Sequence, residues 1–150
     1  MQGPSVLVTE DDADILELIT YSLESEGFRV FPAKSGNEAL SILTDESVDM
    51  ALLDVMLPEM DGFAVCEAIR LHDSSVPILF LSAKNTSDDK ITGLRRGADD
   101  YITKPFNLEE FLLRVHALIK RGLSRYDRQQ IEDIFKFGKN EINFITYEVK

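Results

Sequence analysis

Short apolar runs alternate with segments of helical period along the first 120 residues, and this alternation limits the possible fold more than any other feature. Five runs have the length and composition of strands: SVLVTE, FRVFPA, VDMALLD, VPILFLS and DYITK. The third and fourth runs are apolar almost without interruption, which is typical of strands covered on both faces. The pattern therefore favours a parallel sheet with helices on both sides.

The segments that separate and follow these runs place apolar residues at helical spacing. One helical face of the first segment holds Ile15, Leu16, Ile19 and Leu23. The second segment opens with SGNE, in which Ser35 and Glu38 are spaced to cap the first turn reciprocally. Five strands alternating with five helices predict right-handed crossovers, and hence an α/β fold with a doubly wound five-stranded parallel sheet.

Polar side chains stand at the carboxyl ends of four of the five predicted strands. They are Glu10, Asp11 and Asp12 after the first, Asp54 after the third, Ser82 at the end of the fourth and Lys104 at the end of the fifth. Ligands of open parallel sheets bind in the crevice outside these ends. We therefore expect one shared site there, with Asp12 turned aside to cap the first helix.

Neighbouring carboxylates need either raised pKa values or a cation. At about 4 Å each pair repels by roughly 1 kcal/mol in water and about 4 kcal/mol at an intermediate dielectric. Mg²⁺ suits such a site, because it takes a few carboxylates and keeps several waters. Asp54 alone would suit a turn cap equally well. The rigid loop DVMLPEMDG and the lysine of TKPF favour a reactive site.

Composition narrows the classes of partner. The formal net charge is -11, whereas broad binding to a phosphate backbone needs clustered Lys and Arg. The single cysteine, Cys66, excludes an internal disulfide, and it falls on an apolar helical face where core packing is expected. No apolar run of about 18 residues and no leader appears. We predict a soluble, cytoplasmic protein with no membrane partner.

The charge divides the chain unevenly. Residues 1–120 hold 10 Lys or Arg against 22 Asp or Glu, a net of -12, whereas residues 121–150 hold 6 against 5, a net of +1. We predict one domain over residues 1–122 and a polar linker over residues 123–133. Residues 134–150 contain short alternating apolar stretches that predict two or three strands, too few to close a core alone.

Four motifs together resemble the receiver domain of two-component response regulators over residues 5–122. They are VLVTEDD, LLDVMLPEMDG, LSA and GADDYITKPF. Each motif is modest by itself, but their order and spacing make the match highly specific. The resemblance implies the flavodoxin-like receiver fold with strand order 2-1-3-4-5.

The resemblance also implies a role for each site residue. Asp54 would be the phosphoacceptor, taking a phosphoryl group from a phosphohistidine of a sensor histidine kinase. Mg²⁺ would be held by Glu10, Asp11, Asp54 and the backbone carbonyl of Met56. Lys104 would pair with the phosphoryl oxygens, and its peptide bond to the following proline would be cis. Such a domain phosphorylates and dephosphorylates itself with Mg²⁺ but is a signalling domain rather than an enzyme.

Two further positions resemble the switch of this family. The hydroxyl of Ser82 would move to the phosphoryl group, and the aromatic ring of Tyr101 would turn inward. The readout should involve the fourth helix, because SDDKITGLRRG has only Ile91 and Leu94 as strong apolar anchors. A weakly anchored helix is the one most easily shifted.

The segment GADDYITKPFNLEEFLLRVHALIKR resembles winged-helix transcription factors that form homodimers on phosphorylation. Their dimer face consists of the fourth helix, fifth strand and fifth helix. Lys90 with Glu110 and Asp100 with Arg114 match two charge pairs that usually cross the two-fold axis. A solvated charged face would account for the same residues.

Residues 134–150 resemble the small antiparallel sheet that opens a winged-helix DNA-binding domain. We therefore expect the chain to hold a whole receiver and the start of a truncated effector domain. DNA would be bound only through the effector domain missing from this chain. The expected function is a phosphorylation switch that controls dimerisation and transcription.

Three other classes share parts of this pattern. Phosphatases of the haloacid dehalogenase type also use an aspartyl nucleophile, but their second acid lies two residues later, where this chain has Met56. Flavodoxin-like electron carriers share the fold but need a Gly-rich and hydroxyl-rich phosphate loop, whereas EDDAD would repel a flavin phosphate. The acidic residues, Lys104 and Ser82 argue against an unphosphorylated pseudo-receiver.

Overall fold

Five parallel strands form one sheet, as the sequence pattern predicts, and their order β2-β1-β3-β4-β5 is the one that the family resemblance implies. The computed structural model describes residues 3–73, 75–83, 91–92, 94–95 and 97–126. The strands are β1 (Ser5–Thr9), β2 (Arg29–Ala33), β3 (Met50–Leu53), β4 (Ile78–Ser82) and β5 (Asp100–Thr103). The helices that lie wholly within the described residues are α1 (Ala13–Ser25), α2 (Gly36–Asp45), α3 (Gly62–His72) and α5 (Leu108–Tyr126).

The part of the chain that the structure describes therefore has four complete helices, one fewer than the five predicted. The expected fourth helix falls mainly on residues outside the described ranges. Within it, residues 91–92 and 94–95 have helical backbone. Its two expected anchors, Ile91 and Leu94, are 46% and 50% exposed, so neither is buried in a core.

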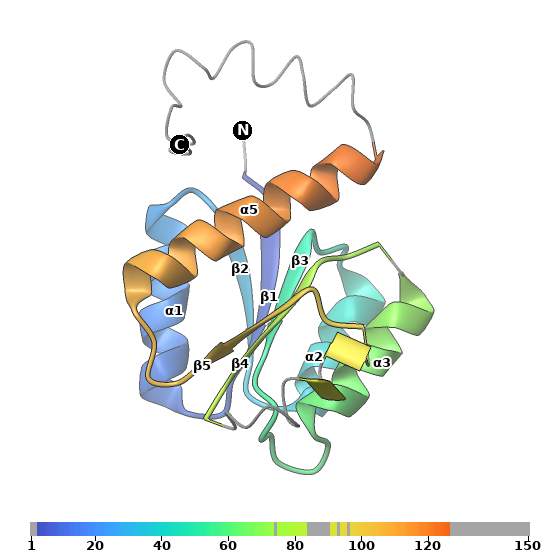
Figure 1. Ribbon diagram of the computed structural model, residues 1–150. Helices are drawn as coiled ribbons and strands as arrows, with labels where there is room; N and C mark the ends of the chain where they lie inside the picture. The colour runs from blue at the N-terminus through green and yellow to red at the C-terminus, as the bar shows by residue number, and fades with distance from the viewer. Residues whose placement is uncertain (1–2, 74, 84–90, 93, 96, 127–150) are drawn as a thin grey trace, which may run out of the picture.

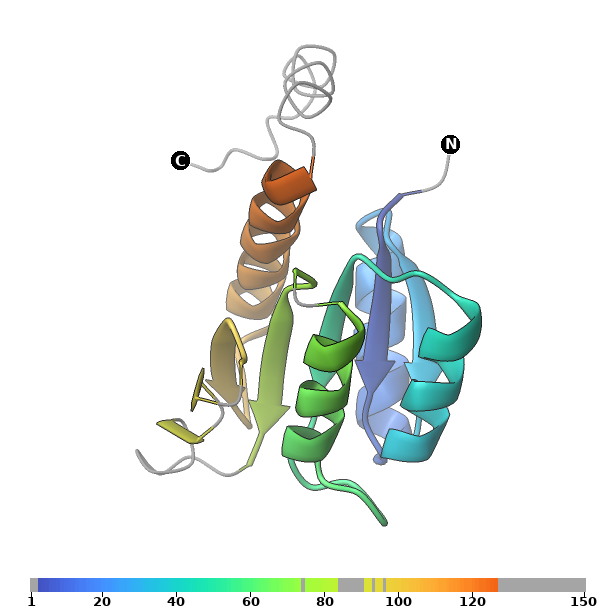
Figure 2. The same ribbon diagram turned by 90° about the vertical axis from the view of Figure 1, so that its right-hand side faces the viewer.

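Two apolar cores lie on opposite faces of the sheet. Figures 1 and 2 show α1 and α5 covering one face and α2 and α3 covering the other. The first core joins Ile19 of α1 and Phe111 of α5 to one set of alternate strand residues. The second core joins Leu43 of α2 and Cys66 of α3 to the other set. Because both faces are covered, β1, β3 and β4 consist entirely of buried residues.

Side-chain caps set the beginning of each complete helix. The capping residues are Asp12 for α1, Ser35 for α2 and Asp61 for α3, and Asn107 accepts from the first turn of α5. The reciprocal cap predicted for α2 is shifted by one residue. The Ser35 hydroxyl accepts from the Glu38 N–H at 3.1 Å, but the Glu38 carboxylate accepts from the N–H of Lys34 instead.

The strand register brings the reactive ends together. Thr9 of β1 lies beside Leu53 of β3, and Ser82 of β4 lies beside Thr103 of β5. The residues that follow β1, β3 and β5 therefore emerge at the same edge of the sheet. The outer strand β2 carries Pro32, which has no N–H to offer a further strand.

The last helix continues to Tyr126, four residues into the segment predicted as a linker. The rest of that segment and residues 134–150 lie outside the described residues, so the division of the chain stays a prediction. Among the described helices, none combines the length and apolar character needed to cross a bilayer.

Candidate functional site

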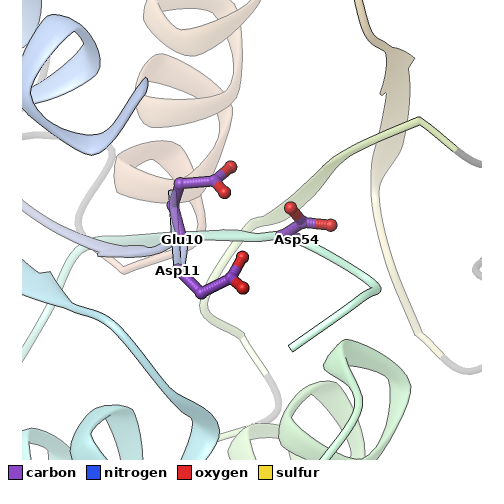
Figure 3. Close-up of side chains that lie close together, drawn as sticks. All are labelled: Glu10, Asp11 and Asp54. Atoms are coloured by element: carbon purple, nitrogen blue, oxygen red, sulfur yellow. The ribbon is translucent and has the colours of Figure 1, made fainter. Parts of the chain in front are cut away.

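Three carboxylates from two strand ends face one space at the carboxyl edge of the sheet. Glu10 and Asp11 follow β1, and Asp54 follows β3. One oxygen from each of the three lies within 4.8 Å of the others (Figure 3). Glu10 and Asp54 are buried, at 2% and 6% exposure, whereas Asp11 is exposed. The structure thus brings together the acids that the sequence predicted would meet.

The end of β5 supplies a cation to this acidic group. The Lys104 ammonium donates to Glu10 Oε1 at 2.6 Å and to Asp54 Oδ2 at 2.8 Å. The predicted cis peptide between Lys104 and Pro105 is present. The Lys104 N–H also donates to the carbonyl of Ser82 at 2.8 Å, which fixes the residue beside the end of β4.

Burial and charge act in opposite directions on Glu10. Loss of solvent raises the pKa of the Glu10 carboxyl above its ordinary value. The hydrogen bond from Lys104 and the N–H of Asp12 lower that pKa, and the negative charge of Asp54 raises it again. The net shift is upward, so the folded protein holds a proton on Glu10 more readily than an unfolded chain does.

For the pKa of the Lys104 ammonium, charge outweighs burial. Burial lowers the pKa of its ammonium, but hydrogen bonds to Asp54 and Glu10 and the charges of both carboxylates raise it by more. The resulting pKa lies above the ordinary lysine value. Lys104 is therefore a positive charge at neutral pH and neutralises part of the acidic group.

The loop after β3 holds Asp54 in place. Asp54 Oδ1 accepts from the Met56 N–H at 2.9 Å, and the Asp54 N–H donates to the carbonyl of Thr9. Gly62 begins α3 so close to this loop that a Cβ there would lie 2.1 Å from the carbonyl oxygen of Asp54. Glycine is required at position 62 because of this close approach. The expected cation contact of the Met56 carbonyl stays a prediction.

The middle of the same loop has unusual backbone. Glu59 has φ of 69°, in the left-handed region that few side chains adopt. Its carboxylate accepts from the Asn37 amide of α2 at 2.8 Å. This contact joins the loop to α2, next to the site.

The two predicted switch residues lie on β4 and β5. Ser82 is fully buried at the end of β4. Tyr101 is 9% exposed, and its ring packs against Phe80 with centroids 5.9 Å apart. The ring is thus largely buried against β4. The switching roles of both residues stay predictions.

The donor set fits a hard divalent cation such as Mg²⁺. Such ions prefer carboxylate and carbonyl oxygens, and each of the three acids offers one oxygen within 4.8 Å of the other two. Glu10, Asp11 and Asp54 are therefore the residues that could hold it. Lys104 already contacts two of them.

The residues predicted for a dimer face pair within the chain. Arg114 of α5 contacts Asp100 of β5 at 2.7 Å and Glu110 at 2.9 Å. These bonds raise the pKa of Arg114, with Asp100 the largest cause. Lys90 lies outside the described residues, so its expected pairing with Glu110 cannot be compared with this arrangement.

Sequence reasoning missed the bond between Lys104 and Glu10. It assigned the lysine to a phosphoryl group and the glutamate to a cation, and 94 positions separate the two residues. The signal that could have indicated it was charge, because a buried acid at one strand end needs a buried base nearby. The predictions that Asp12 caps a helix and that Cys66 packs in a core are confirmed.

Comparison with known proteins places the chain among signalling proteins. Residues 6–116 match the response regulator receiver domain family. The match includes every site residue named above.

Curated relatives are transcriptional regulatory proteins. The chain is 44% identical to PrrA of Mycobacterium tuberculosis over 119 residues, which cover 79% of this chain and 51% of PrrA. It is 45% identical to the alkaline phosphatase synthesis transcriptional regulatory protein PhoP of Bacillus subtilis over 117 residues, which cover 78% of this chain and 49% of PhoP. The chain thus spans about half the length of the curated relatives it matches.

A solved structure agrees with the fold. The receiver domain of the Francisella response regulator 1452 superposes with a TM-score of 0.75 at 37% identity. The superposition covers 79% of this chain and 98% of that domain. The family match over residues 6–116 includes the three acids and Lys104.

Proposed function

The chain belongs to the response regulator receiver domain family, and from that premise we propose that it accepts a phosphoryl group on Asp54 from a phosphohistidine of a sensor histidine kinase. The reaction would require Mg²⁺. One observation carries the proposal: Asp54 is buried at the end of β3, within 4.8 Å of two further carboxylates and 2.8 Å from the Lys104 ammonium.

The transfer balances as an exchange of one bond for another. A carboxylate oxygen of Asp54 forms a bond to phosphorus, and the bond from phosphorus to the histidine nitrogen breaks. The electron pair of the broken bond stays on that nitrogen. The imidazole ring takes up one proton from water, so the result is an acyl phosphate on Asp54 and a neutral histidine on the kinase. Small phosphodonors would react in the same way with a different leaving group.

Phosphoryl transfer depends mainly on positioning and on neutralising negative charge. When bound, Mg²⁺ supplies positive charge that offsets repulsion between the carboxylates and the phosphoryl oxygens. The Met56 N–H fixes one oxygen of Asp54, which orients the other. Lys104 already donates to Oδ2 of Asp54, so its ammonium is placed to follow a phosphoryl group that forms there.

We infer that the domain is a signalling switch that the phosphoryl group turns on. Ser82 would donate to the phosphoryl oxygens from the neighbouring strand end, with Tyr101 packed behind it. The β5 and α5 face, with the expected fourth helix, would then pair with a second copy. The curated relatives are transcriptional regulators, which supports control of transcription in the cytoplasm through a winged-helix DNA-binding domain.

The decisive experiment is phosphorylation of the purified chain by acetyl phosphate with Mg²⁺, followed by intact-mass measurement. The wild type should gain one phosphoryl group, and Asp54→Asn should gain none, because the amide cannot act as the nucleophile. Asp14→Asn is a matched control, since Asp14 lies exposed in the first turn of α1. Equal labelling of the Asp54→Asn variant would disprove the assignment.

Dependence on the cation is tested in the same assay. Addition of a chelator should stop labelling, and Asp11→Asn should weaken it strongly, because Asp11 offers the most accessible carboxylate of the three. Labelling that persists undiminished in the chelator would remove Mg²⁺ from the proposal while leaving Asp54 as acceptor.

A further inference from the structure

We propose that residues 134–139 of this chain, IFKFGK, bind in an apolar groove between the end of α1 and the first half of α5. The groove would be the surface through which the receiver domain holds the segment that follows the predicted linker. This inference goes beyond the proposed function, because the contact needs neither Mg²⁺ nor a phosphoryl group.

Three leucines of α5 give the groove its apolar lining. Leu108, Leu112 and Leu113 line a space of about 630 Å³. Leu108 and Leu113 are 37% and 49% exposed, whereas Leu112 packs partly against the core. Ligand pockets of proteins typically have volumes of about 300–1,000 Å³. The groove is therefore open, and it is large enough to take apolar side chains from another segment.

The end of α1 closes one side of the groove. The first turns of α5 lie beside α1 (Figure 1), and Oε1 of Glu26, the residue that caps the end of α1, lies 2.9 Å from Nε2 of His116. The His116 ring also packs against Phe28, with ring centroids 5.1 Å apart. These contacts hold the end of α1 against α5, so that the groove has a wall from each helix.

The charges beside the leucines are acidic. Glu26 and Glu109 line the groove, and none of its lining residues within the described part of the chain is Lys or Arg. A segment that carries lysines beside apolar side chains complements such a surface. The same face of a second copy does not, because it would set carboxylates against carboxylates.

Residues 134–139 have the complementary composition. Phe135 and Phe137 are apolar, Lys136 and Lys139 are basic, and no Asp or Glu lies among these six residues. In an extended segment, alternate side chains point to the same side. Phe135, Phe137 and Lys139 would therefore face the groove together, with the two rings on the leucines and the ammonium of Lys139 beside an acid.

The chain is long enough to bring this segment back to the groove. The helix α5 ends at Tyr126. At a rise of 1.5 Å per residue, His116 lies about 15 Å and Leu108 about 27 Å back along its axis. The seven residues 127–133 span up to roughly 23 Å when extended. Residue 134 can thus arrive beside His116, and the next residues can run toward Leu108, which brings Lys139 to Glu109.

Paramagnetic broadening in the full chain tests the contact. A spin label on Asn140→Cys should broaden the methyl signals of Leu108 and Leu113 strongly. Cys66 is buried, so one label per chain is expected, and the intact mass verifies this. Leu71 of α3 is the control, because it is 90% exposed and belongs to the helices that cover the other face of the sheet. Equal broadening of Leu71 and the two groove leucines would overturn the inference.

Variants outside the described residues test which side chains bind, without altering the receiver domain. Phe135→Ser combined with Phe137→Ser should reduce the broadening of Leu108 and Leu113 to the level of Leu71. The matched pair, Phe144→Ser with Tyr147→Ser, should leave it unchanged. Equal effects of the two pairs would mean that residues 134–139 are not the occupant.

A charge exchange tests the predicted direction of the segment. Glu109→Lys should weaken the broadening, and Lys139→Glu in the same chain should restore it. Glu46→Lys makes the same charge change at the end of α2, on the other face of the sheet, and should have no effect. Equal weakening by Glu46→Lys, or no recovery in the double variant, would contradict the pairing of Lys139 with Glu109.

A mixed sample identifies the chain that supplies the segment. Spin-labelled chains are mixed with unlabelled chains, and only the unlabelled chains carry the observed methyl groups. Broadening that vanishes in this mixture supports binding within one chain, whereas broadening that persists would assign the groove to a segment of a second copy and overturn the inference. Neither result bears on phosphorylation of Asp54, so the proposed function stands or falls separately.

Discussion

At the scale of single residues, the site keeps an acidic group, Glu10, in a buried place where its charged form is disfavoured. Glu10 is almost fully buried although burial disfavours its charge, and its pKa is raised despite the contact with Lys104. Residues that carry such conflicts are typical of functional sites rather than of cores. Glu10 thus makes the resting protein less stable at neutral pH than a neutral side chain would.

Glu10→Gln should reveal this penalty through its pH dependence. A raised folded pKa means that the native state binds the proton more tightly than the unfolded chain. The contribution of Glu10 to stability therefore falls as pH rises through the window from its ordinary value to its folded value. We expect the free energy of unfolding of Glu10→Gln, relative to wild type, to rise as the pH increases above the ordinary pKa of a glutamate carboxyl.

Urea unfolding in the presence of a chelator at several pH values measures that difference. The chelator is needed because bound cation would stabilise the wild type by mass action. A stability difference that stays flat or decreases with pH would contradict the upward direction of the Glu10 pKa.

Glu59 carries backbone strain that can be measured separately from its side-chain contact. Both Glu59→Ala and Glu59→Gly lose the bond to Asn37, but only glycine adopts a φ of 69° without strain. We expect the glycine variant to be more stable than the alanine variant by about 1 kcal/mol.

The matched control is the same pair of substitutions at Glu67, in the middle of α3. There the order should reverse, because glycine is less favourable than alanine in a helix by roughly 1 kcal/mol. Chemical denaturation of the four variants measures the difference in the free energy of unfolding between glycine and alanine at each position. If alanine is more stable than glycine at position 59 as well as at position 67, the backbone at position 59 is not left-handed in solution.

At the scale of elements, a cluster at the opposite end of the sheet ties α3 to the start of β5. Arg70 of α3 donates to the carbonyls of Gly97 and Val76 and contacts Asp99 at 2.9 Å. Asp99 also accepts from the Ile78 N–H at the start of β4. One arginine therefore joins α3 to the segments that lead into β4 and β5.

Arg70→Met should destabilise the fold by about 2–4 kcal/mol, because it removes several charged hydrogen bonds and leaves partly buried acceptors without a donor. Arg121→Met is the control, since Arg121 contacts the same Asp99 from α5 at 3.3 Å but is 53% exposed. That exposed pair should contribute no more than about 1 kcal/mol. Similar losses in the two variants would mean that the Arg70 cluster adds little.

The elements were predictable from sequence to the extent that their signals are local. Apolar runs identified all five strands, and capping residues such as Asp12 and Ser35 identified helix starts. The bond between Lys104 and Glu10 and the cluster of Arg70 with Asp99 depend on contacts across 94 and 29 positions. No local pattern encodes such pairings, because an arginine on a helix has the same sequence signal whether it is solvated or bridging.

At the scale of the whole molecule, the acidic site and the proposed dimer face lie on adjacent surfaces. The acidic site lies at the carboxyl edge of the sheet, and β5 runs from it to the charged group of Asp100, Glu110 and Arg114. Lys104 directly follows this strand, so any movement of β5 reaches both surfaces. The charges now paired within the chain are the ones predicted to pair between two copies.

Mixing of charge-reversal variants can decide whether Asp100 and Arg114 pair within one chain or between two copies. Asp100→Arg and Arg114→Asp each place like charges opposite one another, whether within a chain or between chains. If the phosphorylated protein dimerises through this pair, each variant alone should stay monomeric. An equimolar mixture should form heterodimers, because Arg at position 100 of one chain then meets Asp at position 114 of the other.

Sedimentation with beryllofluoride and Mg²⁺, which mimic the phosphoryl group, measures this rescue. Pairing confined to one chain gives no rescue, since each variant keeps its own repulsion in the mixture. Dimers in the mixture but in neither variant alone would assign the pair to the interface. Dimers in both single variants and in their mixture would place the interface elsewhere. If the wild type dimerises but both variants and their mixture stay monomeric, the pair of Asp100 and Arg114 stabilises the face from within one chain.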